Sequence, residues 1–344
     1  MASFGGSSKG GASATGGSGG GSGRGTTDGS GGKASATGGS GGSGGKATGT
    51  GGGSGGMKSG GCGKTSTLTF GAASSGTGKG GSVTIGNRNF IMRLPDNYDM
   101  NKPYWLIFGF HWRDGSATAV DSGGDNRYAM AHYGLQALSK NGAIFVAPHG
   151  LNGGWGNSGG ADMDFVDAIL ETVQDNYCVD KTHIFANGFS WGGGMSYAIA
   201  CERANVFRGV AIYNGGVLSG CVGGNDPIAV WQMHGLTDRT LQIRDALPMR
   251  DRFVKNNGCT AQTPPQPPEP PPYLVNGGHI CTDYQGCMPG KPFRWCVHQS
   301  GHGNAIVDGT DDLFHRCANP GMTCSDSCRC SWVPQDVWTW MNSL

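Results

Sequence analysis

The stretch HIFANGFSWG, residues 183–192, decides how this chain folds. Residues 183–187 form an apolar run that predicts a buried strand, and residues 191–203 predict a helix. Between them lies the pattern G-x-S-x-G, which in this context is a nucleophile elbow, a sharp turn that exposes a serine. Gly188 and Gly192 lack Cβ atoms, so the chain can make that turn. Ser190 is therefore the predicted nucleophile.

The pattern alone has little weight in a chain with 67 glycines. Residues 16–20, 52–56 and 156–160 match it as well. None of these three follows directly on a β-branched or aromatic run, so each lacks the strand that an elbow needs. Only Ser190 has the required context.

Apolar runs and helical patterns alternate along the rest of the chain. The predicted strands are residues 82–85, 88–94, 104–110, 143–148, 183–187, 209–213, 228–233 and 293–297. The predicted helices are residues 127–140, 162–175, 191–203, 241–256 and 334–343. This alternation predicts a mostly parallel central sheet flanked by helices, and together with the elbow it predicts an α/β-hydrolase fold. Ligands then bind beyond the carboxyl ends of the strands.

The first 61 residues differ from the rest in composition. They are almost wholly Gly, Ser, Ala, Thr and Lys, and the segment ASATGGSGG at residues 12–20 recurs at 34–42. A segment with nothing to bury cannot offset its backbone entropy, so we expect a disordered repeat linker over residues 1–61. Residues 62–344 then form one catalytic domain.

Charge and cysteine content limit the partners and the compartment. A net charge of +1 without a basic stripe argues against nucleic acid, and no apolar run reaches transmembrane length. The first residues lack the apolar core of a signal segment. Twelve cysteines nevertheless indicate disulfides and an oxidising compartment. We therefore expect a secreted protein whose signal segment is not seen in this chain.

Four cysteines cluster near the C-terminus, close to His315. They are Cys317, Cys324, Cys328 and Cys330. Their spacing lacks the paired C-x₂-C arms of a zinc site, so the segment of about residues 307–330 is interpreted as a disulfide-stapled loop and no metal is expected.

An aspartate follows the strand predicted at residues 228–233. Asp238 lies a few residues past the strand end, where the acid of a catalytic triad belongs. Asp226 precedes the strand and Asp245 lies within the next helix, so both are less suitable. The alternative for Asp238 is a turn or N-cap residue.

A histidine between two glycines follows the strand predicted at residues 293–297. His302 can direct its ring toward Ser190 from this loop and act as the general base. His298 is still on the strand, and His315 belongs to the cysteine-rich loop. Three further histidines precede the nucleophile and so break the order serine, acid, histidine: His111, His132 and His149.

Stabilising the tetrahedral oxyanion needs two backbone N–H groups. One is the amide of Trp191, directly after the nucleophile. The other should come from residues 111–115, which follow the strand predicted at 104–110.

Several motifs occur together in one order. They are residues 110–113 (FHWR), 154–155 (GW), 160–167 (GADMDFVD), 188–192 (GFSWG), 234–238 (HGLTD) and 301–303 (GHG). In this order they resemble the secreted esterases that include feruloyl esterases, acetylxylan esterases and polyhydroxybutyrate depolymerase-like proteins. The resemblance covers about residues 62–297, the His302 loop and the last helix. It implies a serine esterase that needs no metal or cofactor, with Ser190, Asp238 and His302 as its triad.

The chain departs from this group in two places. Many members carry His-Gly where this chain has His111-Trp112, which leaves Trp112 and Arg113 as alternatives for the second oxyanion amide. The insertion at about residues 307–330 does not map onto the motifs of this group, and it follows the histidine closely, where it could cover the site.

Three tryptophans on predicted site loops indicate the substrate. Flat rings at Trp112, Trp155 and Trp191 could stack on a hydroxycinnamoyl group, which favours feruloyl esters of plant cell-wall polysaccharide. The alternative for Trp191 is core packing. A polyester depolymerase, an acetylxylan esterase and a non-catalytic binding protein on the same fold are the alternative functions. We expect a monomer.

Overall fold

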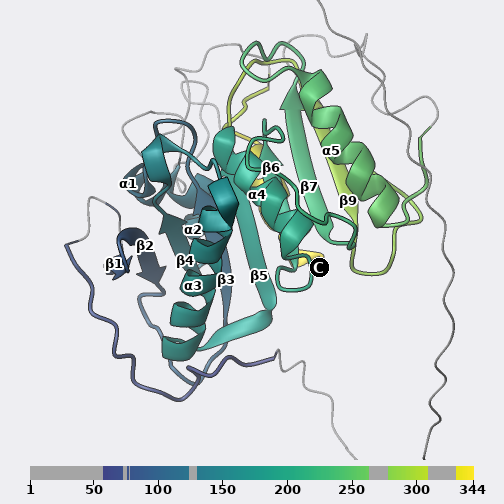
Figure 1. Ribbon diagram of the computed structural model, residues 1–344. Helices are drawn as coiled ribbons and strands as arrows, with labels where there is room; N and C mark the ends of the chain where they lie inside the picture. Colours follow the sequence, from purple (N-terminus) through teal and green to yellow (C-terminus); the bar gives the residue numbers. More distant parts are fainter. Residues whose placement is uncertain (1–56, 73–75, 77, 124–129, 263–277, 309–330) are drawn as a thin grey trace, which may run out of the picture. The chain divides into compact units, whose positions relative to one another are not determined.

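The computed structural model describes residues 57–72, 76, 78–123, 130–262, 278–308 and 331–344. Its described strands form one sheet in the order β1-β2-β4-β3-β5-β6-β7-β9-β8 (Figure 1). The strands are β1 (Lys79–Ile85), β2 (Arg88–Leu94), β3 (Tyr104–Phe110), β4 (Ala143–Pro148), β5 (Val179–Phe189), β6 (Gly209–Tyr213), β7 (Ala229–Gly235), β8 (His279–Asp283) and β9 (Phe293–His298). The run from β4 to β9 is parallel, and β1, β2 and β8 add antiparallel pairings. The predicted α/β-hydrolase fold is confirmed.

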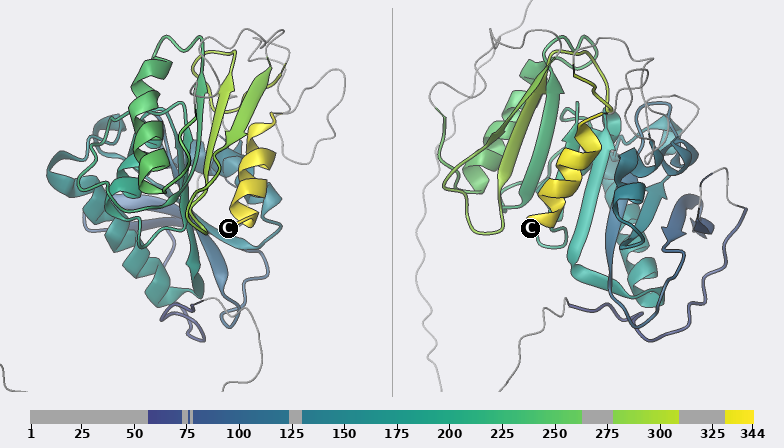
Figure 2. Two further views of the ribbon diagram at one scale, coloured as in Figure 1. Left: turned by 90° about the vertical axis from the view of Figure 1, so that its right-hand side faces the viewer. Right: turned by 180° about the vertical axis from the view of Figure 1, so that it is seen from behind.

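Helices cover both faces of the sheet. They are α1 (Ala117–Ser122), α2 (Leu135–Leu138), α3 (Ala161–Asn176), α4 (Trp191–Glu202), α5 (Ile243–Asn256) and α6 (Val333–Asn342). The apolar residues of α3, α4 and α5 belong to one core cluster, and those of α1, α2 and α6 belong to a second one. Figure 2 shows α6 and α5 on opposite sides of the sheet. A strand between two apolar layers is buried on both faces, which explains the continuous apolar runs in the sequence.

The segment predicted as one helix over residues 127–140 is the largest difference from the sequence prediction. Residues 127–129 lie outside the described part. From Ala131 to Gly134 the chain forms a 3₁₀ turn, and only Leu135–Leu138 is helical. His132 and Tyr133 have φ values of 49° and 57°, in the left-handed region that interrupts a helix.

Strand β8 and helix α1 were not predicted. Strand β8 lies at the edge of the sheet, is only half-buried, and carries Cys281 directly opposite Cys296 of β9. Helix α1 has only six residues, although Ser116 accepts a hydrogen bond from the Ala119 amide as its N-cap. Short and half-polar segments give too weak a periodicity to be recognised.

Four disulfides staple the described part of the chain. They join Cys62 to Cys178, Cys201 to Cys221, Cys259 to Cys287 and Cys281 to Cys296. The predicted disulfide stapling is therefore confirmed for these eight cysteines. The C-terminal cysteine cluster lies outside the described residues.

The folded part begins a few residues earlier than the predicted boundary at Cys62. Lys58 forms a β-bridge with Asp180, and the Ser59 amide donates to the Val179 carbonyl (3.0 Å). The Ser59 hydroxyl also donates to the Tyr177 carbonyl (2.7 Å) and is buried. These contacts attach residues 57–61 to the start of β5, which the composition of the segment does not indicate. The rest of the predicted linker lies outside the described residues.

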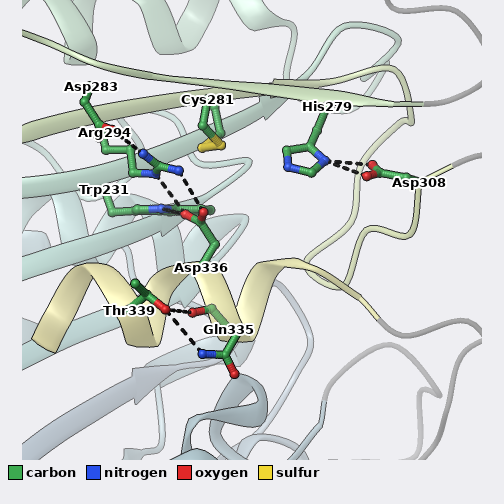
Figure 3. Close-up of polar contacts among 10 residues, drawn as sticks. Trp231, His279, Cys281, Asp283, Arg294, Asp308, Gln335, Asp336 and Thr339 are labelled. Carbon is green, nitrogen blue, oxygen red and sulfur yellow. Dashed lines mark hydrogen bonds and ion pairs between the residues drawn. A yellow bond between two sulfur atoms is a disulfide. The ribbon is translucent and has the colours of Figure 1, made fainter. Parts of the chain in front are cut away.

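A carboxylate anchors α6 to the sheet (Figure 3). Asp336 accepts hydrogen bonds from Trp231 Nε1 on β7 (2.7 Å) and from Arg294 Nε and Nη2 on β9 (2.9 and 2.8 Å). Because Trp231 is fully buried, its indole N–H needs this partner. None of the helices that the structure describes is long and apolar enough to cross a membrane.

Candidate active site

Ser190 lies at the turn between β5 and α4, as the elbow predicts. Its backbone has φ 57° and ψ −115°, a conformation that favours glycine. The Ser190 amide donates to the Tyr213 carbonyl (3.0 Å), and its carbonyl accepts from the Gly194 amide (3.0 Å). A Cβ at Gly188 would overlap the Gly192 backbone, and one at Gly192 would overlap the Phe110 carbonyl. Both glycines are therefore required by the close packing of the turn.

Asp238 and His302 are brought together although they are 64 residues apart. His302 Nδ1 lies 2.6 Å from Asp238 Oδ2. The other carboxylate oxygen accepts the amides of Thr240 (2.8 Å) and Leu241 (2.9 Å). Burial alone would raise the pKa of Asp238, but the hydrogen bonds from His302 and the two amides outweigh it and hold the pKa below its ordinary value. Asp238 is thus an ionised acceptor that orients the imidazole.

The histidine loop lies next to the elbow. The His302 ring centroid is 4.7 Å from that of Phe189, the residue before Ser190. Asn214, directly after β6, donates from Nδ2 to the Gly301 carbonyl (3.0 Å), and its Oδ1 accepts from His298 Nε2 (3.1 Å). Asn214 is fully buried and was not identified from the sequence, although a polar residue directly after an apolar strand is a usable signal.

The loop after β3, residues 111–115, carries the candidate amides for the oxyanion. Two of them are already engaged: the Asp114 amide donates to the Gly153 carbonyl (2.7 Å) and the Gly115 amide to the Trp112 carbonyl (3.0 Å). The amides of Trp112 and Arg113, both named from the sequence, remain as candidates beside that of Trp191.

The three predicted substrate tryptophans have different environments. Trp155 is 0% exposed, and its Nε1 donates to the His111 carbonyl (2.8 Å). The prediction that its ring stacks on a substrate is therefore wrong, because neighbouring core side chains cover the ring. Trp112 and Trp191 are half-buried, and the Arg113 guanidinium lies 5.9 Å from the Trp191 ring centroid.

Exposed apolar side chains follow two parallel strands, β4 and β6, which are separated in the sheet by β3 and β5, and sequence reasoning missed them. Leu151 after β4 is 46% exposed, and Val217 and Leu218 after β6 are 51% and 37% exposed. Leu218 packs over the first turn of α4, since a Cβ at Gly194 would lie 2.9 Å from the Leu218 Cβ. These three side chains offer apolar surface at the edge of the sheet where Ser190 lies.

One group of potential metal ligands occurs in the described part of the chain: Cys281, Cys296 and Asp336. The two cysteines form a disulfide, so neither can supply a thiolate. Asp336 is occupied by Trp231 and Arg294. This group is therefore a structural cluster and not a metal site.

An α/β-hydrolase with a serine elbow and a histidine–aspartate pair has the architecture of a serine hydrolase, and the relatives of this chain define it as a serine esterase. No family model matches it. The chain is 44% identical to "Feruloyl esterase C" of Emericella nidulans over 244 residues, which cover 70% of this chain and 87% of that protein. It is 43% identical to "Feruloyl esterase D" of Neurospora crassa over 258 residues, 71% and 87% of the two chains. The chain belongs to the feruloyl esterase family.

A solved structure gives a weaker likeness. The acetyl xylan esterase from Aspergillus awamori aligns with a TM-score of 0.47 and 16% identity, covering 66% of this chain and 94% of that chain.

Proposed function

We propose that this protein hydrolyses feruloyl and related hydroxycinnamoyl esters of plant cell-wall polysaccharide, with Ser190 as nucleophile, His302 as general base and Asp238 as the acid that orients it. One observation carries the site assignment: His302 Nδ1 lies 2.6 Å from Asp238 Oδ2, on a loop packed against the elbow residue Phe189. The substrate class is supported by the feruloyl esterases that this chain resembles over most of their length.

The proposed reaction is acyl transfer in two steps. His302, held by Asp238, takes the proton of Ser190 while the serine oxygen attacks the ester carbonyl. The oxyanion accepts the amide of Trp191 and that of Trp112 or Arg113. His302 then protonates the leaving alcohol, and a water molecule repeats the sequence to release the acid.

The proposed acyl site is apolar and aromatic. The exposed side chains of Leu151, Val217 and Leu218 and the partly exposed ring of Trp191 suit a planar hydroxycinnamoyl group. Trp112 is half-buried on the neighbouring loop and would contribute the edge of its ring.

A substrate panel tests this proposal. We expect purified protein to hydrolyse methyl ferulate with a kcat/KM at least about tenfold above that for acetylated xylan, because an acetyl group cannot fill an apolar acyl site. Short-chain polyhydroxybutyrate tests the polyester depolymerase. A preference for acetylated xylan or for the polyester would contradict the proposed substrate, and no turnover of any ester would favour a binding protein.

We further propose that the protein is secreted and monomeric. Four disulfides among the described residues suit an oxidising compartment, since cytosolic thiols are kept reduced. Light scattering measures the mass of the purified protein in solution, and the mass of a dimer would contradict the proposed monomer.

A further inference from the structure

The direction of the oxyanion donors depends on how the loop after β3 is held. In a trans peptide the carbonyl of one residue and the N–H of the next point in opposite directions. A hydrogen bond that fixes the carbonyl therefore also fixes the direction of the following N–H. The relevant carbonyls are those of His111 and Trp112, because they precede the amides of Trp112 and Arg113.

The second of these carbonyls is held by the Gly115 amide (3.0 Å) and, from the buried side, by the imidazole of His111. Its Nε2 lies 2.9 Å from the Gly150 amide, which can only donate, so Nε2 is the unprotonated acceptor. Nδ1 then carries the proton and donates to the Trp112 carbonyl at 2.7 Å. The ring is fully buried, and burial lowers the pKa of His111 to about 4, which keeps it neutral near pH 7.

The indole of Trp155 holds the first carbonyl. Its Nε1–H donates to the His111 carbonyl at 2.8 Å, and its ring lies 5.0 Å edge-on from Phe110 and 4.9 Å from the His111 ring. The Trp155 main-chain carbonyl accepts a hydrogen bond from the Ser219 hydroxyl (2.6 Å), which connects the backbone of Trp155 to the loop after β6. Both peptide planes of the candidate oxyanion segment are thus fixed from the buried side.

We propose that His111 is a positioning residue for ester hydrolysis, which fixes the peptide between Trp112 and Arg113, and that Trp155 does the same for the peptide between His111 and Trp112. The inference rests on the proposed function, because it concerns the amides that would bind the oxyanion of the Ser190 adduct. Neither side chain contacts the substrate in this proposal. Their effect is on transition-state stabilisation and not on ground-state binding, since the oxyanion exists only after attack.

Two substitutions at one position separate this role from simple packing. In His111→Asn the side-chain amide nitrogen takes the place of Nδ1 and keeps the bond to the Trp112 carbonyl. In His111→Gln the side-chain amide oxygen takes the place of Nε2 and accepts the Gly150 amide, so only that bond is kept. Both variants lose the imidazole ring, so each is the packing control for the other.

The expected result is a difference in kcat. His111→Gln should lower kcat on methyl ferulate about tenfold to hundredfold with KM within about twofold, as for loss of part of an oxyanion hole, whereas His111→Asn should stay within about fivefold of wild type. Trp155→Phe keeps a large ring and loses only the N–H, so it should also lower kcat and leave KM unchanged.

The inhibition constant of phenylboronic acid reports on the oxyanion donors and does not change when a variant that is still folded is merely less stable. The Ser190 oxygen adds to boron and its proton goes to His302, which gives a tetrahedral anion that needs the oxyanion donors. We expect the inhibition constant to rise in His111→Gln and Trp155→Phe by a factor similar to the fall in kcat, and to stay near the wild-type value in His111→Asn.

Equal kcat values and equal inhibition constants in His111→Asn and His111→Gln would overturn the inference and leave His111 a packing residue. Thermal unfolding of each variant establishes that it is folded, and Trp155→Phe carries the test if neither His111 variant folds. Failure of the proposed function has a different signature, because wild-type protein would then not hydrolyse methyl ferulate or Ser190→Ala would retain activity.

Discussion

Ser190, the proposed nucleophile, has a left-handed backbone that Ser158 of the described match at residues 156–160 does not share. We predict that Ser190→Ala lowers kcat on methyl ferulate about a thousandfold or more, because a triad acts as a unit, while thermal unfolding stays near that of wild type. Steady-state kinetics on the purified variant measure this.

Ser158 offers a matched control for this substitution. It stands in the match at residues 156–160, but it lies in a 3₁₀ turn before α3 and does not end a strand. Ser158→Ala should keep the wild-type kcat. If Ser190→Ala retained a tenth of the wild-type rate, the nucleophile would have to be sought elsewhere.

His111 makes stability depend on pH in a defined window. Burial lowers its pKa from 6.5 to about 4, and the His149 ring at 5.6 Å and the nearby Arg88 act in the same direction. Between these two values the unfolded chain binds a proton that the folded chain does not, so stability falls as the pH drops from about 6.5 toward about 4. The full effect is about 3 kcal/mol.

Urea unfolding between pH 4.5 and 7 measures this dependence. His111→Asn should flatten the dependence, although burial also lowers the pKa of His234 and leaves a remainder of the same sign. An unchanged slope in the variant would contradict the assignment to His111.

The candidate triad could be predicted from the sequence, because the order serine, acid, histidine and the position of each residue after an apolar strand can be recognised there. Burial of a particular ring was not predictable: Trp155 follows a glycine on a loop, as an exposed platform would, yet it is covered by core side chains. The bonds of Asn214 to Gly301 and His298 connect residues 84 to 87 positions apart, and no local pattern encodes such a pairing.

Among the secondary-structure elements, the hydrophobic pattern of the sequence predicted the long helices and the strands that are buried on both faces. Strands β3, β4 and β6 have the predicted bounds, and α3 extends its prediction by one residue at each end. The short edge strand β8 was missed because it buries little apolar surface. The region of His132 and Tyr133 was predicted as helix because its composition permits one, whereas the packing of the fold imposes left-handed backbone there.

Helix α6 provides a prediction at this scale. Asp336→Ala leaves the buried Trp231 N–H without its acceptor and removes the acceptor of Arg294 Nε and Nη2, although Arg294 Nη1 keeps its bond to Asp283, so we expect a loss of about 2 kcal/mol in the free energy of unfolding. Urea denaturation measures it. Thr339 is exposed on the same helix and bonds within it (Figure 3), so Thr339→Ala should change stability by less than about 0.5 kcal/mol. Equal losses in both variants would mean that Asp336 does not anchor the helix.

For the whole molecule, the N-terminal boundary can be tested by two truncations. Removing residues 1–56 takes away a segment that has no apolar anchor in its sequence, and we expect kcat on methyl ferulate to stay within about twofold. Removing residues 1–62 also takes away the Ser59 contacts and the Cys62–Cys178 disulfide. That second truncation should lose about 2–4 kcal/mol of stability.

Activity assays and thermal unfolding of both truncated proteins measure these effects. Equal stability of the two would place the boundary after Cys62. A large loss of kcat in the shorter truncation would give the glycine-rich segment a catalytic role.

The backbone conformation of Ser190 is unfavourable for the stability of the fold, although it exposes the hydroxyl that the proposed reaction needs. At φ 57° and ψ −115° every side chain costs about 1–2 kcal/mol relative to glycine. We therefore expect Ser190→Gly to unfold at a higher temperature than Ser190→Ala, although both lack the hydroxyl, and differential scanning calorimetry of the pair decides it. An equal or lower unfolding temperature would mean that the surrounding turn carries no strain. Stability alone would favour glycine at this position, so a serine here fits its proposed role as the nucleophile.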